Sequence, residues 1–217
     1  RFATITAILL AFIGATGMWM HSMITLSSVL VSVLICFVIG VPLGVLASYN
    51  KWYRDIQNVV LDAMQTLPYF CYLIPVLMFF GGNIVSAVIA TVIYSVPPII
   101  RLTALGLSQV SGGYSEVSKS FGGTGIQTLN KVKFPLAVPS LVMGFNQTVI
   151  MAFAMQIVTP LIGGKGLGLQ VFNALQRSDT GRGLSAGLAI VLLAIIIDRI
   201  THAWTKKQRQ ALGLDQS

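Results

Sequence analysis

The sequence predicts an all-α protein that crosses a membrane several times, and its composition, its apolar runs and the placement of its charges predict this fold class. Of the 217 residues, 55% are hydrophobic and only 9% are charged, and the mean hydropathy is +0.82. A soluble domain carries about 25% charged residues, so this chain has too few to cover a surface in water. Lipid is therefore the expected solvent for most of the chain.

Six apolar runs are long enough to cross a bilayer as helices, which takes about 20 residues. The first has no small-residue cleavage site, so we interpret it as a span rather than a signal peptide. We expect Pro68 and Pro75 to bend the third span, and Pro97 and Pro98 to break the fourth. All six belong to one membrane domain over residues 1–217, and they lie near residues 2–20, 23–48, 57–80, 84–105, 135–158 and 185–204.

Lysine and arginine gather at one side of these spans if the spans alternate in direction. That side holds the cations of the 51–54 turn, the 106–134 loop and the C-terminal tail, whereas the 159–184 loop on the other side holds three. The cation-rich side is cytoplasmic by the positive-inside rule, so we expect both termini and the 106–134 loop in the cytosol. The net charge of +8 therefore reflects membrane topology, because the cations do not form the single basic face that nucleic-acid binding needs.

The 106–134 loop begins with the pattern of a short amphipathic helix. Ser115 is its expected N-cap, and Glu116 follows near the positive end of the helix. Val117 and Phe121 are four residues apart, so they share one face. Gly122 then opens a glycine-rich turn that ends the helix.

A second short helix follows the turn, with Ile126, Leu129 and Val132 on one side. Pro135 sits where the next membrane helix should begin, at a first-turn position that needs no amide donor. No nucleotide-binding or catalytic pattern accompanies these two helices. They are typical of a docking element for a cytosolic partner.

The spacing in this loop resembles the cytoplasmic signature of ABC importer permeases, which reads Glu-Ala-Ala, three residues, Gly, nine residues and Ile-x-Leu-Pro. Here Glu116-Val117-Ser118, Gly122 and Val132-Lys133-Phe134-Pro135 hold those places, with modest substitutions at four positions. The resemblance implies that the loop fits a cleft on an ATPase subunit and transmits its closure to the membrane helices. The residues expected to make this coupling contact are Glu116, Val117, Ser118, Phe121, Gly122 and Pro135.

Four motifs inside the spans resemble the permeases of glycine betaine/proline importers. They are Asp62–Pro68, Pro97–Thr103, Asn146–Thr148 and Asp198–Arg199. The likeness runs from about residue 25 to 204 and implies a type I ABC importer permease (MetI-like) fold with five or six transmembrane helices and a cytoplasmic coupling helix. It also implies a quaternary-ammonium or zwitterionic cargo, such as glycine betaine, proline betaine, choline or trimethylamine oxide.

Polar side chains within the spans are expected to face the bundle interior or a path, because lipid-facing positions are costly for them. One interpretation is that they line a translocation path for a zwitterion; the other is that they hydrogen-bond between helices. For Asp62, the second interpretation predicts a structural ion pair with Arg54 or Arg101. The candidates for the path are Asp62, Gln65, Thr66, Asn146, Gln147 and Thr148.

The 159–184 loop contains a glycine run that is not a phosphate-binding loop. It lacks the Gly-Lys-Ser/Thr ending, follows no strand and lies on the side away from cytosolic ATP. A short surface or re-entrant helix is expected here, and the resemblance implies that it belongs to an outer gate or docks a binding protein. The glycines in question are Gly163, Gly164, Gly166 and Gly168.

The chain has no Walker motif, so we expect no catalytic residue, metal or cofactor of its own, with ATP and Mg²⁺ bound to a partner ATPase. The expected partners are a cytosolic ABC ATPase dimer, a periplasmic or lipid-anchored substrate-binding protein, a second copy of this permease and membrane lipids. The expected location is the bacterial cytoplasmic (inner) membrane. Two alternatives stay open: an ABC permease for an amino acid such as methionine, and an ion-coupled secondary transporter.

Overall fold

The computed structural model describes residues 11, 14 and 16–211, and every regular element among them is helical. The all-α class is thus confirmed. The span expected at 2–20 lies largely outside the described residues. In chain order, the elements are α2 (Trp19–Tyr49), α3 (Lys51–Thr66), α4 (Phe70–Phe80), α5 (Ile84–Ser95), α6 (Pro97–Gln109), α7 (Gly112–Ser120), α8 (Gly125–Thr128), the π-helical η1 (Leu129–Lys133), α9 (Phe134–Met155), the 3-10 helix η2 (Thr159–Ile162), α10 (Leu167–Arg177) and α11 (Thr180–Ala211).

Four continuous helices in the described part are long and apolar enough to cross a membrane: Trp19–Tyr49, Ile84–Gln109, Gly125–Met155 and Thr180–Thr201. The span expected over 57–80 is instead two helices, α3 and α4, that meet at an angle of 94°. Leu67 is the cause, because it precedes Pro68 and adopts an extended ψ of 134°, as residues before proline prefer. The break at residues 67–69 therefore falls near the middle of this apolar segment.

Pro97 and Pro98 divide the fourth span as expected, because α5 ends at Ser95 and α6 begins at Pro97. The two pieces together still form one span of 26 residues. Proline is tolerated at such a position because its fixed φ suits a helix, and its missing N–H costs little where the turn begins.

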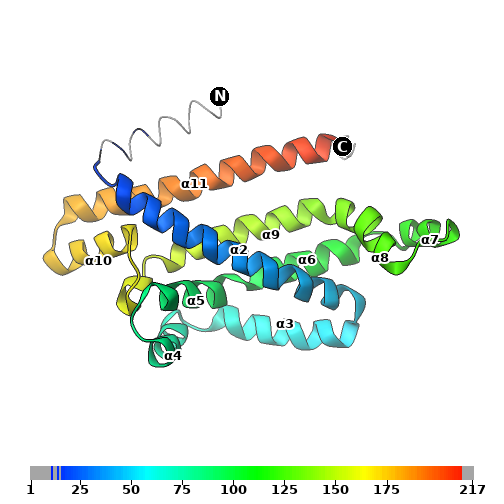
Figure 1. Cartoon of the computed structure of the whole chain (residues 1–217), viewed down its shortest axis with the longest axis horizontal. Helices are drawn as coiled ribbons and strands as arrows, with labels where there is room; N and C mark the ends of the chain where they lie inside the picture. Colours follow the sequence, from blue (N-terminus) through cyan, green and yellow to red (C-terminus); the bar gives the residue numbers. More distant parts are fainter. Residues whose placement is uncertain (1–10, 12–13, 15, 212–217) are drawn as a thin grey trace.

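Helix α6 lies between α2 and α9 and forms the centre of the bundle (Figure 1). Gly40 and Gly44 of α2 face it, one helical turn apart. A Cβ at Gly40 would lie 2.4 Å from Ile99 Cγ2, and one at Gly44 would lie 2.6 Å from Thr103 Cβ. Glycine at these two positions therefore lets the backbones approach closely, which is how membrane helices gain packing energy.

The two ends of the molecule carry different elements. Helices α7 and α8 extend beyond the bundle at one end, which also holds the junction of α2 with α3 (Figure 1). Helix α10 and the first turns of α2 and α11 lie at the other end. The cations Lys51, Arg54, Lys119, Lys131 and Lys133 therefore belong to the same end of the fold.

Candidate functional site

The first helix of the helical loop (residues 110–133) begins one turn earlier than expected. Helix α7 starts at Gly112 with Ser111 at its N-cap, so Ser115 lies inside the helix and is not the cap. The extended backbone of Val110 ends α6, and the Tyr114 amide donates to the Ser111 carbonyl at 3.2 Å. The two glycines that follow Ser111 are accommodated in the first turn of α7 rather than ending the preceding helix.

The turn after α7 is a Schellman motif centred on Gly122. Gly122 has a φ of +75°, its amide donates to the Lys119 carbonyl at 2.9 Å, and the Gly123 amide donates to the Ser118 carbonyl at 2.9 Å. This left-handed conformation favours glycine, which explains Gly122 at the end of the helix. The turn sets the direction in which α8 leaves α7.

Side-chain hydrogen bonds hold α7 and α8 together. Thr124 and Gln127 form a capping box at the start of α8. The Ser118 and Thr128 hydroxyls lie 2.8 Å apart and join the two helices. A hollow of about 450 Å³ lies between them, lined by Tyr114, Val117, Ser118, Phe121, Gly123, Gln127, Lys131 and Val132.

The helical loop exposes large apolar side chains. Phe121 is 88% exposed and Ile126 is 74% exposed, and Tyr114 and Val117 are exposed beside them. Glu116 is also exposed on α7. Apolar side chains gathered on a polar loop mark an interaction surface.

The apolar residues expected on one side of the second helix lie in two different environments. Ile126 points away from the bundle, whereas Leu129 packs against the cluster of Leu107, Ala137 and Leu141. The π-helical η1 begins at Leu129, so the helical period changes only from this residue onward.

Helix α8 continues through η1 into α9 as one helix over Gly125–Met155, rather than ending before a new membrane helix. Pro135 follows η1 at the start of α9, and so lies inside this continuous helix rather than in the first turn of a new membrane helix. The Lys133 ammonium lies 5.2 Å from the centre of the Tyr49 ring and so joins the base of the loop to the end of α2. A displacement of α8 can thus act directly on a membrane helix.

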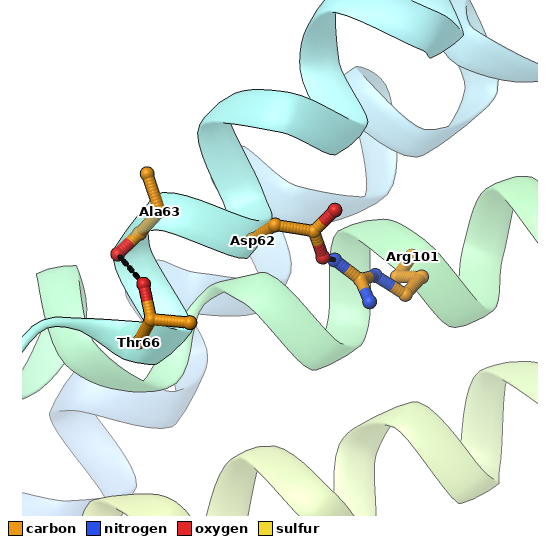
Figure 2. Close-up of polar contacts among 4 residues, drawn as sticks. All are labelled: Asp62, Ala63, Thr66 and Arg101. Carbon is orange, nitrogen blue, oxygen red and sulfur yellow. Dashed lines mark hydrogen bonds and ion pairs between the residues drawn. The ribbon is translucent and has the colours of Figure 1, made fainter.

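Asp62 and Arg101 form the ion pair that one interpretation expects. The Arg101 guanidinium donates to Asp62 Oδ1 at 2.7 Å, which joins α3 to α6 (Figure 2). Both side chains are exposed to a substantial degree. Thr66 lies one turn along α3 from Asp62, and its hydroxyl donates to the Ala63 carbonyl at 3.1 Å.

The other path candidates separate into two groups. Gln65, Thr66 and Gln147 are exposed, whereas Asn146 and Thr148 are buried between helices. Asn146 Oδ1 and Thr148 Oγ1 have no hydrogen-bond partner within the described structure. Only the exposed group lies on an open surface of this chain.

The glycine run at the opposite end serves close packing. Gly164, Gly166 and Gly168 are buried, and Gly163 and Gly166 have φ values of +91° and +90°. A Cβ at Gly168 would lie 1.8 Å from the Gln156 carbonyl oxygen, and one at Gly166 would lie 2.4 Å from Thr25 Oγ1. The segment is therefore fastened against α2 and the end of α9, which positions α10 at the surface.

A cluster of three tyrosines lies at the break between α3 and α4, and the sequence analysis does not identify it. Tyr69 directly precedes α4, Tyr72 lies in α4 and Tyr94 lies in α5. The ring centroids of Tyr69 and Tyr94 are 5.1 Å apart, and those of Tyr72 and Tyr94 are 6.2 Å apart. Tyrosine in the middle of apolar runs, away from their ends, is the signal that points to them.

Comparisons with known proteins agree with this arrangement. Residues 40–210 match the family model described as binding-protein-dependent transport system inner membrane component. The chain is 44% identical over 204 residues to the glycine betaine/proline betaine transport system permease protein ProW of Escherichia coli (strain K12), covering 94% of this chain and 58% of that protein. It is 42% identical over 200 residues to the glycine betaine transport system permease protein OpuAB of Bacillus subtilis (strain 168), covering 92% and 71%.

The fold is also similar to a solved structure. A chain of the MetNI methionine ABC transporter in an inward-facing conformation superposes with a TM-score of 0.77 at 23% identity, covering 85% of this chain and 93% of that chain. This likeness confirms the MetI-like fold. The chain spans less than two thirds of the length of the ProW relatives.

Proposed function

The chain belongs to the family of binding-protein-dependent transport system inner membrane components, and from that premise we propose that it forms half of the membrane channel of an ATP-driven importer. It is a multi-pass membrane protein and a transport subunit rather than an enzyme. The proposed cargo is a small quaternary-ammonium or zwitterionic solute such as glycine betaine, proline betaine, choline or trimethylamine oxide. ProW and OpuAB, whose names specify betaine transport, support this cargo.

The observation that carries the proposal is the exposed apolar surface of the helical loop at the end of a continuous membrane helix. Phe121 and Ile126 project from α7 and α8, and α8 runs without a break into α9. A cytosolic ABC ATPase dimer, which binds ATP and Mg²⁺, is the proposed partner for this surface. Closure of that dimer would displace α8 and, through η1, rotate or shift α9.

The exposed polar side chains of α3 are the reason for proposing a second copy of the permease. Asp62, Gln65 and Thr66 are exposed on this helix although it belongs to the bent span. Side chains of this kind avoid lipid, so they are expected to face a second copy or the path between two copies. Gln147 extends the same proposal to α9.

The orientation follows from the charges. Five cations at the α7 end favour the cytosol for that end, and both termini are proposed to be cytosolic. The opposite end, with α10 and the packed glycine run, is the proposed docking site for a periplasmic or lipid-anchored substrate-binding protein and part of the outer gate.

Replacement of Phe121 tests the ATPase contact. Phe121→Ala should reduce the ATPase subunit that co-purifies with the permease by about ten-fold, because an exposed aromatic anchor is removed without loss of internal packing. Uptake of glycine betaine should fall with it, while the amount of permease in the membrane stays unchanged.

The matched control is Leu184→Ala, since Leu184 is 67% exposed at the opposite end of the molecule. This variant should bind the ATPase as the unmodified chain does. Equal loss in both variants, or full association of Phe121→Ala, would remove the helical loop from the coupling contact.

A further inference from the structure

The tyrosine cluster (Tyr69, Tyr72 and Tyr94) has rings set at steep angles to one another. The Tyr69 and Tyr94 rings are inclined by 63°, and the Tyr72 and Tyr94 rings by 61°. Ring pairs at these angles and separations pack edge to face, so each pair uses one ring face internally. The outer face of an exposed ring in such a cluster still attracts a large, weakly hydrated cation such as a trimethylammonium group.

Two members of the cluster are held by the fold and one is accessible. Tyr72 is buried, and its hydroxyl donates to the Met64 carbonyl across the break. Tyr94 is half-buried in α5. Tyr69 is 42% exposed, so it presents the open face of a fixed cluster.

The cluster does not lie where tyrosines of membrane proteins are usually found. Aromatic side chains gather at the two membrane–water interfaces. Tyr94, however, lies near the middle of the 84–109 span, and Tyr69 lies in the middle of the bent span. These positions lie away from the ends of both apolar segments, where an exposed tyrosine is expected to face a polar environment rather than lipid.

Charged and polar side chains lie on the elements that flank the cluster. Asp62 and Thr66 are one turn apart at the end of α3, which stops before Tyr69, and Tyr94 and Arg101 are seven residues apart in one continuous span. Seven residues correspond to about 10 Å along a helix, with nearly the same direction around it. The Arg101 Nε is buried and has no hydrogen-bond partner in the described structure.

We propose that the tyrosine cluster is a contact site for the quaternary ammonium group of the cargo within the translocation path, with Arg101 as the next contact for its carboxylate. The inference rests on the proposed function, because it names a site in the permease for the proposed cargo. The cargo is shorter than the separation between Tyr94 and Arg101, so it meets the two contacts in succession. Weak binding at successive contacts permits release, which conduction requires.

Ligand-observed saturation-transfer NMR on the purified permease–ATPase complex, without the binding protein, tests the site directly. Glycine betaine and 3,3-dimethylbutanoate serve as probes, because the second has the same shape and carboxylate but a neutral carbon in place of the nitrogen cation. We expect glycine betaine to bind and the neutral analogue to bind about ten-fold more weakly or not at all.

Variants of Tyr69 separate an aromatic contact from a structural role. Tyr69→Leu should weaken glycine betaine binding about ten-fold, Tyr69→Phe should keep it, and Tyr69→Trp should strengthen it, because tryptophan has the strongest cation–π attraction. Phe79→Leu is the matched control, since Phe79 is 83% exposed on α4 outside the cluster. It should bind as the unmodified chain does. Co-purification of the ATPase reports folding in each variant.

Two outcomes overturn the inference. One is equal binding of glycine betaine by Tyr69→Leu, Tyr69→Phe and the unmodified complex; the other is equal binding of both probes. Uptake by the unmodified complex with its binding protein is measured separately. If the unmodified complex takes up glycine betaine while Tyr69 variants bind it equally, only this site is wrong. If the unmodified complex does not take it up, the proposed cargo is wrong.

Discussion

The contact between Asp62 and Arg101 connects two helices that share few other polar contacts. An ion pair that stays wet contributes little, about 0.2–1 kcal/mol, whereas a lone charge facing lipid is far more costly. Both side chains are exposed within this chain, so the proposed path or the second copy provides their surroundings. The pair fits either a static link or a contact that opens as α3 moves relative to α6.

A charge exchange distinguishes a specific pair from two independent charges. Asp62→Asn and Arg101→Leu should each lower uptake by about five-fold or more, because each leaves the partner unpaired in the membrane. The double variant Asp62→Arg with Arg101→Asp should recover much of the activity, with a coupling energy of about 1 kcal/mol or more. Uptake and thermal stability in detergent are the measurements.

Arg54→Leu is the control, because Arg54 is the other cation considered for Asp62 and no contact joins the two in the structure. It should leave uptake unchanged. If the exchanged pair remains as inactive as the single variants, the two side chains act separately.

At the scale of the elements, sequence patterns predict the presence of the helices but not the angle between them. Long apolar runs predict the helices of the bundle. The residues expected to contact an ATPase lie on the helical loop from Glu116 to Gly122, and Pro135 lies just after it in α9. The break at Pro68 was expected only as a bend, because a proline can either kink or end a helix and the choice depends on tertiary contacts. Here the Tyr72 hydroxyl of α4 donates to the Met64 carbonyl of α3, which fixes the angle between the two helices.

The helical loop shows that local capping preferences do not always predict where a helix begins. Ser115 fits the N-cap preference, yet α7 begins at Gly112, because the chain turns at Val110 and Ser111 as α6 ends. The sequence also left open whether Asn146 and Thr148 face the bundle interior or a path; both are buried, because their face of α9 packs against neighbouring helices. Single-residue preferences therefore identify the elements but not which face of each meets its neighbours.

Because α8, η1 and α9 form one helix, we predict that a variant with a broken helix still binds the ATPase subunit but loses transport. Asn130→Pro should interrupt this helix within η1, because proline removes an amide donor and costs about 3 kcal/mol in a helix interior. Asn130 is exposed, so no internal packing is lost. The ATPase subunit should still co-purify through α7, while uptake falls by more than about ten-fold.

Asn130→Ala keeps the helix and should behave as the unmodified chain, which makes it the matched control. Normal uptake by Asn130→Pro would show that displacement of α8 does not have to pass along a continuous helix to α9. Loss of ATPase association in the same variant would place η1 in the contact itself.

At the scale of the whole molecule, the mechanism depends on which end faces the cytosol. The α7 end carries the exposed apolar surface of the helical loop and five cations, and the α10 end carries tightly packed glycines and three cations. An ATPase can act only on a cytosolic surface, so an importer requires the α7 end inside. In the opposite orientation in the membrane, the helical loop would lie outside the cytosol and could not contact an ATPase that uses cytosolic ATP.

Cysteine labelling measures this orientation. Cys71 is exposed and Cys36 is buried, so Cys71→Ser provides a background with little reactivity. On that background, Ser120→Cys on α7 should react with a membrane-impermeant maleimide only in inverted vesicles. Gln176→Cys on α10 should react only from outside intact cells, since both positions are exposed but lie at opposite ends of the bundle (Figure 1). Reaction of Ser120→Cys in intact cells would place the helical loop outside, and no arrangement of an ATP-driven importer would then fit this chain.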